Sequence, residues 1–459
     1  MSRRVAFACI LLAAIIGGVI EWRQPMLPDS SWLLWVAGRW LDGATLYRDV
    51  FEVNPPLAIW LHAPVVWIAR FAGTPVAAVF RLAVLLWCAG CVAVFDTVLR
   101  ACGHAQLRIA TIAAAAIVLV LPGPFFGQRE HLLLAAALPW TALVACRMEN
   151  REVPLLLAVV AGMLVAVAIA LKPTHVGLWV ALPLLAWRRR WWRYPETWIV
   201  PALGLGYVGL VAADTSYFAY LREWGPVYWQ YRHLPFLKAA FGNELALLAV
   251  AACLAGVHFR RQPLTAAMLA STAGCLLGAA LQAKGLPYHY WPADGMALLL
   301  LATAAPFTRY ALVPVAVVWM FGLAQFAWDA GSGMRRGLAQ LEASLQGRRP
   351  LVLGRTDDAG WLLVSEAGLP WLSPHYCLWW LQLSRGRPVV PDLPHWAAQD
   401  SALRLSLLPS SPPEALLIES GALDVEGWLR RAPEWRRLLA EYEPMGSAAG
   451  YRVFYHVAR

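Results

Sequence analysis

The chain has 459 residues, of which 60% are hydrophobic and only 14% are charged, and its formal net charge is +10. This composition excludes an ordinary soluble protein. The positive charge does not indicate nucleic-acid binding, because Lys and Arg fall mostly in short loops between apolar segments. We therefore expect a polytopic α-helical membrane protein, with membrane lipids among its partners and no nucleic acid.

Apolar segments recur along the chain at about the length that crosses a hydrocarbon core of roughly 30 Å. Twelve candidates lie at residues 4–21, 57–72, 76–99, 108–122, 131–147, 154–171, 175–188, 197–213, 243–259, 264–281, 293–306 and 308–328. The first resembles a signal sequence, but no small-x-small cleavage site precedes Glu21. We expect this segment to be retained as the first span.

The segment at residues 57–72 is the one that we expect not to cross the membrane. It is short, follows a double proline and contains Pro64. If all twelve segments crossed, the basic loops 188–193 and 258–262 would lie outside, against the positive-inside rule. A juxtamembrane or re-entrant helix at 57–72 leaves about eleven spans and places every basic loop in the cytoplasm.

This topology places four polar loops on the outer side of the membrane. They are residues 22–75, 127–131, 214–241 and 282–292. In the first loop, Trp32, Trp35, Val36 and Trp40 recur at helical spacing, which predicts a helix lying in the membrane interface.

The tail, residues 331–459, is more polar than the preceding part of the chain. The stretches PLVLGR, EALLIES and GYRVFYHV are typical of short strands, and VEGWLRRAPEWRRLLAEY is typical of a helix. We predict a small soluble α/β domain here, on the outer side, after a transmembrane catalytic domain at residues 1–330. The sequence contains no Gly-rich nucleotide-binding loop followed by Lys-Ser or Lys-Thr.

Ionisable residues of both signs gather on the predicted outer side. They are Asp29, Arg48, Asp49, Glu52, Arg129, Glu130, His131, Lys172, His175, Lys284 and His289. Such residues near membrane depth usually line a cavity or a substrate path. Cations of this set would bind a phosphate, and a carboxylate would accept a proton from an incoming hydroxyl.

Structural explanations stay open for the same residues. They are helix capping for Asp29, solvated loop charges for Asp49 and Glu52, a local ion pair for Arg129 and Glu130, snorkelling for Lys172 and an aromatic belt around His289.

Several of these stretches together resemble the GT-C superfamily of membrane glycosyltransferases. The first outer loop carries LPDSSW, AGRWLDG and LYRDVFEVNPPLAIW, and later stretches read GQREH and LKPTH. The pattern is similar to bacterial protein-mannosyltransferase-like and aminoarabinose-transferase-like enzymes over roughly residues 1–300. The resemblance implies that the segment after the double proline is a juxtamembrane helix.

The resemblance also implies an activity. Such enzymes move a sugar, with inversion, from a polyprenyl-phosphate carrier to a lipid, glycan or protein acceptor at the outer face of the bacterial inner membrane. By position, Asp29 would be the general base and Glu130 would help to organise the phosphate or a metal ion. Asp49 and Glu52 would be supporting acids. Candidates to bind the donor phosphate are Arg48, Arg129, Lys172, Lys284 and His289.

The sequence departs from this family at two positions. Many relatives read Lys-Pro-Pro where this chain has Asn54, Pro55 and Pro56, so another cation would have to bind the phosphate. The first-loop acid is often doubled, whereas Ser30 follows Asp29, and two carboxylates hold a divalent cation better than one. We therefore leave the cofactor open: the protein could use a divalent cation or need none.

Two other functions fit a polytopic membrane protein. A polysaccharide polymerase or ligase would concentrate arginines in a large outer loop late in the chain. A transporter or flippase of lipid-linked sugars would show internal repeats and charges near the bilayer midplane. Here no repeat is evident, and the charges cluster toward one side.

Overall fold

The structure is a computed structural model of the chain. It describes residues 2–103, 107–187, 190–231, 233–241, 246–258, 260–304, 332–354, 358–378, 381, 396–421 and 424–457. The chain divides into two compact units. Unit 1 comprises Met1–Gln24, Ala78–Asp214 and Arg232–Trp328, and unit 2 comprises Pro25–Ala77, Thr215–Tyr231 and Asp329–Arg459. The predicted first outer loop therefore groups with the predicted C-terminal domain.

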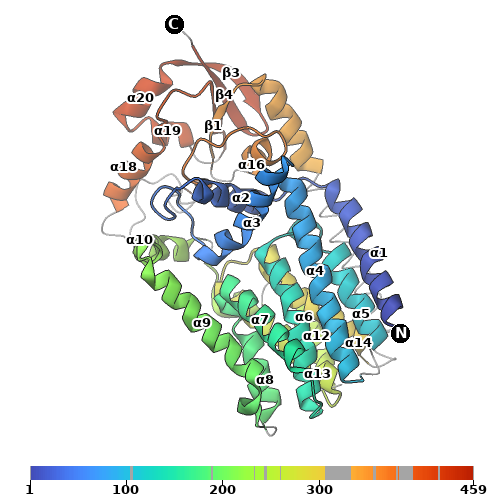
Figure 1. Ribbon diagram of the computed structural model, residues 1–459. Helices are drawn as coiled ribbons and strands as arrows, with labels where there is room; N and C mark the ends of the chain where they lie inside the picture. Colours follow the sequence, from blue (N-terminus) through green and yellow to red (C-terminus); the bar gives the residue numbers. More distant parts are fainter. Residues whose placement is uncertain are drawn as a thin grey trace. The chain divides into compact units, whose positions relative to one another are not determined.

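Unit 1 is built of helices (Figure 1). In chain order they are α1 (Arg3–Trp22), α4 (Val76–Ala101), α5 (Leu107–Ala115), the π-helix η1 (Ala116–Val120), α6 (Arg129–Met148), α7 (Leu155–Leu171), α8 (Gly177–Leu185), α9 (Pro195–Ala213), α11 (Phe236–Ala240), α12 (Leu247–His258), α13 (Pro263–Gln282) and α14 (Pro287–Thr303). Short 3-10 turns link some of them: η2 (Gly123–Phe125), η3 (Pro173–His175) and η5 (Trp191–Arg193).

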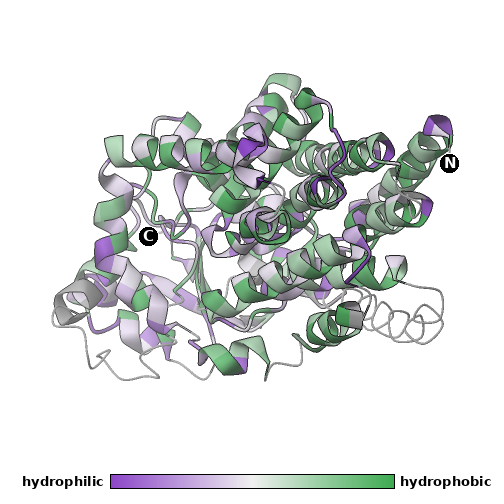
Figure 2. Ribbon diagram, turned by 90° about the horizontal axis from the view of Figure 1, so that it is seen from below, coloured by the Kyte–Doolittle hydropathy of each residue, from purple (hydrophilic) through white to green (hydrophobic). Residues whose placement is uncertain are grey.

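These helices coincide with the predicted apolar segments up to residue 303. Within the described part of the chain, five are long and apolar enough to cross a membrane, namely α1, α4, α6, α9 and α13. Hydrophobic residues dominate along the helices (Figure 2). The count of eleven spans stays a prediction, and the segment 308–328 lies outside the described residues.

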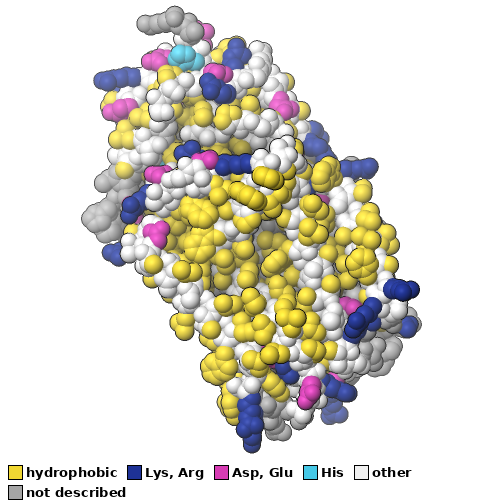
Figure 3. All heavy atoms as spheres, in the orientation of Figure 1, with side chains coloured by type: hydrophobic (Ala, Val, Ile, Leu, Met, Phe, Trp, Pro, Cys, Tyr) yellow, Lys and Arg dark blue, Asp and Glu magenta, His cyan; other side chains and the backbone are white. Residues whose placement is uncertain are grey.

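Burial separates the inner from the outer helices of unit 1. Helix α6 is almost entirely buried and packs against α7, α13 and α14, whereas α1 and α9 are mostly exposed. The exposed positions of α1 are apolar, as at Phe7 and Leu12. Hydrophobic side chains also cover most of the helical face of unit 1 that is in view in Figure 3. This exposed apolar surface suits contact with lipid.

Helix α1 approaches the backbone of the π-helix η1 closely. A Cβ on Gly17 would lie 1.8 Å from the carbonyl oxygen of Leu119. No side chain larger than hydrogen fits there without a backbone shift, so glycine is required at this contact.

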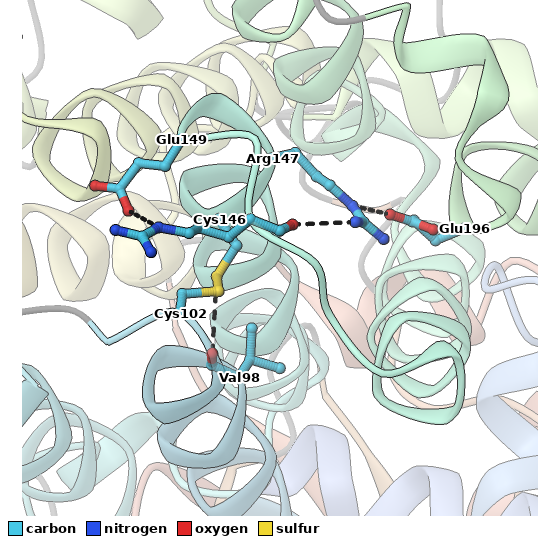
Figure 4. The surroundings of a disulfide bond; sticks show 7 residues. Val98, Cys102, Cys146, Arg147, Glu149 and Glu196 are labelled. Atoms are coloured by element: carbon cyan, nitrogen blue, oxygen red, sulfur yellow. Dashed lines mark hydrogen bonds and ion pairs between the residues drawn. A yellow bond between two sulfur atoms is a disulfide. The ribbon is translucent and has the colours of Figure 1, made fainter.

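One end of unit 1 carries a disulfide and an ion pair (Figure 4). Cys102 and Cys146 are bonded and join the C-terminal ends of α4 and α6. Beside them, Arg147 donates from Nε to Oε1 of Glu196, in the first turn of α9, at 2.7 Å. The basic loops that follow α4 and α6 and that precede α9 therefore lie at the same end, as the topology predicts. The disulfide was not predicted.

The opposite end of unit 1 is formed where α6 begins and where α7 and α13 end. Lys172 follows α7 and donates to Gln282, the last residue of α13, at 3.2 Å. Helix α6 has 20 residues, which corresponds to a length of about 30 Å. The loops at the disulfide end and the loops at the opposite end are thus separated by about the thickness of a bilayer core.

In unit 2, α2 (Pro28–Leu41) and α3 (Pro56–Ala72) pack together. The guanidinium of Arg70 donates to both oxygens of Asp42, at 2.8 and 3.0 Å, and to the carbonyl of Gly38 at 3.3 Å. Arg70 holds the pKa of the exposed Asp42 below its ordinary value by hydrogen bonding. Helix α3, which we predict to be juxtamembrane, therefore lies on α2 within unit 2.

The tail contains a small mixed sheet in the order β1-β2-β4-β3. Its strands are β1 (Pro350–Leu353), β2 (Ala415–Glu419), β3 (Tyr442–Ala448) and β4 (Tyr451–His456), and the helices of the tail are 332–345, α16 (Asp358–Ser365), α18 (Trp396–Ser406), α19 (Val425–Leu429) and α20 (Pro433–Leu439). Strands β1 and β2 pair in parallel, and the other pairs are antiparallel. The predicted strands coincide with β1, β2 and β4, and β3 was missed.

The aromatic face of α2, which we predict to lie in the membrane interface, is largely covered by protein. Trp32 and Val36 are buried inside unit 2. Trp32 packs at 5.2 Å between ring centroids against Trp361 of the tail. Trp40 alone of the predicted set is more than a third exposed, at 38%. The aromatic side chains of α2 therefore serve contact with the tail more than contact with lipid.

Labelling would test the sidedness of unit 1. We expect Arg151→Cys, on an exposed loop at the disulfide end, to resist an impermeant maleimide in intact spheroplasts, because basic loops stay in the cytoplasm. Lys238→Cys, on exposed α11 near the opposite end, should react. The wild-type chain, whose described free cysteines are buried or half-buried, provides the blank. If Arg151→Cys reacted and Lys238→Cys did not, the predicted orientation in the membrane would be reversed.

Candidate functional site

The site begins at the N-terminus of α6. Glu130 is the second residue of the helix and is completely buried. The helix dipole favours a negative charge there. Two hydrogen bonds of His131 fix the preceding turn. Its Nδ1 accepts from the backbone N–H of Gly127 at 3.0 Å, and its Nε2 donates to the carbonyl of Val118 in η1 at 2.8 Å. The described contacts of His131 therefore make it a structural residue.

Glu130 pairs with Lys172. The Nζ of Lys172 lies 2.8 Å from Oε1 of Glu130, and both side chains are largely buried. Lys172 is the C-cap residue of α7. The helix stops there because the next residue, Pro173, cannot continue it. The alternative that Lys172 snorkels to the interface does not describe this geometry.

Three further predicted residues surround the pair. Nε2 of His289, near the start of α14, lies 3.7 Å from Oε1 of Glu130. Arg129, Lys172 and Lys284 are close enough to His289 to act on it electrostatically. The structure therefore brings together Arg129, Glu130, Lys172, Lys284 and His289, which we call the unit 1 cluster.

The unit 1 cluster has an excess of positive charge. Arg129, Lys172 and Lys284 contribute three basic side chains, and Glu130 contributes one carboxylate. Lys284, between α13 and α14, is 6% exposed, and burial lowers its pKa to about 8. Oε2 of Glu130 and Nδ1 of His289 are buried without a hydrogen-bond partner in the described part of the chain. The excess of buried positive charge makes the site chemically suited to an anionic ligand.

A protein-based metal site does not emerge from these residues. In the part of the chain that the structure describes, no three His, Cys, Asp or Glu side chains group so as to hold a metal ion. Glu130 faces the ammonium of Lys172, which supplies positive charge next to the carboxylate.

The proposed base, Asp29, lies in unit 2. Helix α2 begins at Pro28, and its N-cap residue is Leu27, with no side-chain capping bond. The alternative in which Asp29 is the capping residue of this helix therefore does not describe the structure. Asp29 lies in the first turn, half-buried, where its charge interacts favourably with the helix dipole.

Glu52 is not a solvated loop charge, because it is 2% exposed and hydrogen-bonded. Its Oε1 accepts from the backbone N–H of Asn54 at 2.6 Å and from the Asn54 side-chain amide, and its Oε2 accepts from Nε1 of Trp32. These bonds tie the loop before the double proline to α2. Glu52 is thus a structural acid, and the side-chain amide of Asn54 bonds the same carboxylate oxygen as the Asn54 backbone does.

Arg48 and Asp49 are exposed. Asp49 accepts from the backbone N–H of Thr45 at 2.7 Å and closes a local turn. The neighbouring Tyr47 has a φ of +67°, a left-handed conformation that is uncommon outside glycine. Arg48 remains a candidate for ligand binding, whereas the described contact of Asp49 is local.

Sequence reasoning missed Gln282, which bonds Lys172, and the tail residues that contact the first outer loop. Gln282 lies two residues before Lys284, in a stretch that the topology placed on the outer side. The tail residues gave no local signal, because their partners lie more than 300 positions earlier in the chain.

Comparisons with known proteins concern the fold. No family model matches the chain, and no curated protein matches it in sequence. Among solved structures, it is similar to ArnT from Cupriavidus metallidurans bound to undecaprenyl phosphate, with a TM-score of 0.58 at 12% identity over 100% of this chain and 99% of that chain. It is also similar to the archaeal oligosaccharyltransferase AglB from Archaeoglobus fulgidus, in complex with an inhibitory peptide and a dolichol-phosphate. That match covers 98% of this chain and 74% of that chain at 10% identity, with a TM-score of 0.47. This chain therefore shares the fold of ArnT, as the resemblance to aminoarabinose-transferase-like enzymes predicts.

Removal of Lys172 would test the buried pair. Lys172→Met deprives Glu130 of its ion-pair partner, and breaking a buried pair typically costs about 3–5 kcal/mol. We expect a loss of about 3 kcal/mol in the free energy of unfolding, measured by denaturation in detergent, and a partial recovery when Glu130→Gln is added. Lys238→Met, on the exposed surface of α11, is the control. A Lys172→Met protein as stable as this control would refute the pairing.

Proposed function

We propose that the protein is a glycosyltransferase that moves a sugar from a polyprenyl-phosphate carrier to a lipid, glycan or protein acceptor. The observation that carries this proposal is the unit 1 cluster, with its three basic side chains around Glu130 at one end of the helices. The similar fold of ArnT, which was crystallised with undecaprenyl phosphate, supports the choice of a lipid phosphate as the anion.

The chemistry needs two things from the protein. When the acceptor oxygen or nitrogen attacks the anomeric carbon, the bond from that carbon to the phosphate oxygen breaks, and negative charge grows on the phosphate. Arg129, Lys172 and Lys284 would stabilise this charge. The proton of the acceptor must leave as the new bond forms, and Asp29 would take it as the general base. Attack opposite the leaving phosphate inverts the anomeric configuration.

Within this proposal, Glu130 keeps Lys172 in place rather than reacting itself. A carboxylate next to a bound phosphate is unfavourable unless a cation lies between them. The ammonium of Lys172, which also bonds Gln282, meets this condition. Arg48 is the exposed first-loop cation that would be available to the ligand.

We place the reaction on the outer side of the bacterial inner membrane. The unit 1 cluster lies at the end of the helices opposite the basic loops, and basic loops stay in the cytoplasm. This placement also favours an enzyme over a transporter or flippase, whose ionic sites are expected near the middle of the bilayer. We propose the C-terminal α/β part to be on the same outer side.

Transfer assays would test the assignment of roles. Purified protein is supplied with radiolabelled polyprenyl-phosphate sugars and a panel of lipid, glycan and peptide acceptors. We expect Asp29→Asn to reduce kcat by about 10²–10⁴-fold, as for loss of a general base, and Glu130→Gln to weaken donor use.

The matched control is Asp42→Asn, at the other end of α2, where the carboxylate is exposed. It should keep near-wild-type activity. Full activity of Asp29→Asn would remove Asp29 from the role of base, and the absence of any transfer by the wild type would reject the proposed function.

The pH dependence of donor binding should report on Lys284. Because burial lowers its pKa to about 8, its positive charge is present below pH 8 and is lost as the pH rises above that value. We expect the Kd for polyprenyl phosphate to rise by about tenfold between pH 7 and pH 9.5. Lys284→Arg stays charged over this range and should flatten the profile. Identical profiles for the two proteins would exclude Lys284 from phosphate binding.

A further inference from the structure

Residues 374 and 375 of the tail run beside residue 51, in the middle of the first outer loop, within unit 2. The backbone N–H of Phe51 donates to the carbonyl of Pro374 at 3.1 Å, and Phe51 and His375 form a parallel β-bridge. Their rings stack with centroids 4.5 Å apart and planes 8° from parallel. Backbone and side chain therefore both join Phe51 to the tail.

A hydrogen bond fixes the orientation of the His375 ring. Nε2 of His375 lies 3.0 Å from Oγ of Ser406, at the end of α18, and that hydroxyl already donates its only proton to the carbonyl of Leu403 at 2.8 Å. Nε2 must therefore carry the proton and donate to Ser406. Burial lowers the pKa of His375 to about 3, so the ring is neutral at physiological pH.

Two other contacts connect the tail with the first outer loop. Near the start of the loop, the backbone N–H of Met26 donates to Oε1 of Glu366 at 2.8 Å. On α2, Trp32 lies with its ring 5.2 Å from Trp361 and 5.7 Å from Tyr376. The loop residues that contact the tail are thus Met26, just before Asp29, Trp32, just after it, and Phe51, next to Glu52.

The loop also contacts α10 (Ser216–Gln230), which belongs to unit 2 as well. The ring of Tyr220 lies 6.4 Å from Phe51 and 5.7 Å from Tyr47. Tyr220 is buried, and burial raises the pKa of its hydroxyl well above the ordinary value. Phe51 thus has aromatic neighbours from two segments that are far away in the sequence.

From these contacts we infer that His375 is a positioning residue for the proposed glycosyl transfer. It holds Phe51, and through Phe51 it fixes residues 46–54 in the conformation in which Glu52 bonds to both Trp32 and Asn54. Trp32 belongs to α2, the helix that carries Asp29. A residue of the tail, outside the range of the sequence resemblance, therefore contributes to turnover. This inference rests on the proposed function.

Three variants separate the parts of this contact. His375→Ala removes both the stacking and the hydrogen bond, His375→Phe keeps an aromatic ring against Phe51 without the donor, and Phe51→Leu removes the stacking from the other side. His456→Ala is the control, because His456 lies in the same unit, is partly exposed and pairs with the exposed Glu441.

Kinetics provide the first measurement. We expect His375→Ala to lower kcat by about tenfold to a hundredfold while the KM for the donor changes by less than about threefold, because the unit 1 cluster is unaltered. His375→Phe should recover most of the activity. Adding Phe51→Leu to His375→Ala should lower kcat little further, because residues in one contact act non-additively. Wild-type kcat in His375→Ala would overturn the inference.

Limited trypsinolysis provides a second measurement that needs no activity. Arg48 is exposed in the loop that His375 would hold. Below the melting transition of each protein, we expect cleavage after Arg48 to be about tenfold faster in His375→Ala and Phe51→Leu than in wild type or His456→Ala, since local opening exposes the loop.

The two measurements distinguish the possible failures. An inactive wild type together with faster cleavage of His375→Ala would reject the proposed function and retain the positioning of the loop. Equal cleavage rates in all proteins would overturn the positioning. If His375→Ala does not fold, the comparison of His375→Phe and Phe51→Leu with the wild type decides in the same way.

Discussion

The arrangement of unit 1 depends on the buried ion pair between Glu130 and Lys172. A carboxylate that is completely removed from solvent among apolar helices is tolerated only when a partner offsets its charge. Lys172 meets this need only if the start of α6 and the end of α7 lie at the same level, and its bond to Gln282 adds the end of α13 to the same constraint. One electrostatic requirement thus fixes the relative register of three inner helices.

Much of unit 1 could be predicted from the sequence because its signals are local. Apolar runs predict helices, Pro173 predicts the end of α7, and the uneven distribution of basic loops predicts which helix ends share a side. Together these signals place Glu130, Lys172 and His289 at one end of the helices. In the structure, side-chain nitrogens of Lys172 and His289 lie within 4 Å of the Glu130 carboxylate. The disulfide between Cys102 and Cys146 could not be predicted, because the basic loops beside both cysteines predict the cytoplasmic side, where disulfides are rare.

Unit 2 was harder to predict because its contacts are long-range. The face of α2 has the pattern of a membrane-surface helix, and the pattern alone does not reveal whether lipid or protein covers it. Trp361 and Tyr376 of the tail cover it. Likewise, Glu52 looks like a solvated acid in sequence, whereas Trp32 and Asn54 bond it in a buried position. The tail is therefore less separate from the first outer loop than a boundary near residue 330 suggests.

The departure at Asn54 has a physical explanation in these contacts. A lysine there would put a strongly hydrated ammonium beside Glu52, and the carboxylate would then neutralise a cation meant for phosphate. In this chain the Asn54 amide bonds Glu52 instead, and positive charge gathers in unit 1 on Arg129, Lys172 and Lys284. Loop folding, and the anion binding that we propose, thus rest on different residues in different units.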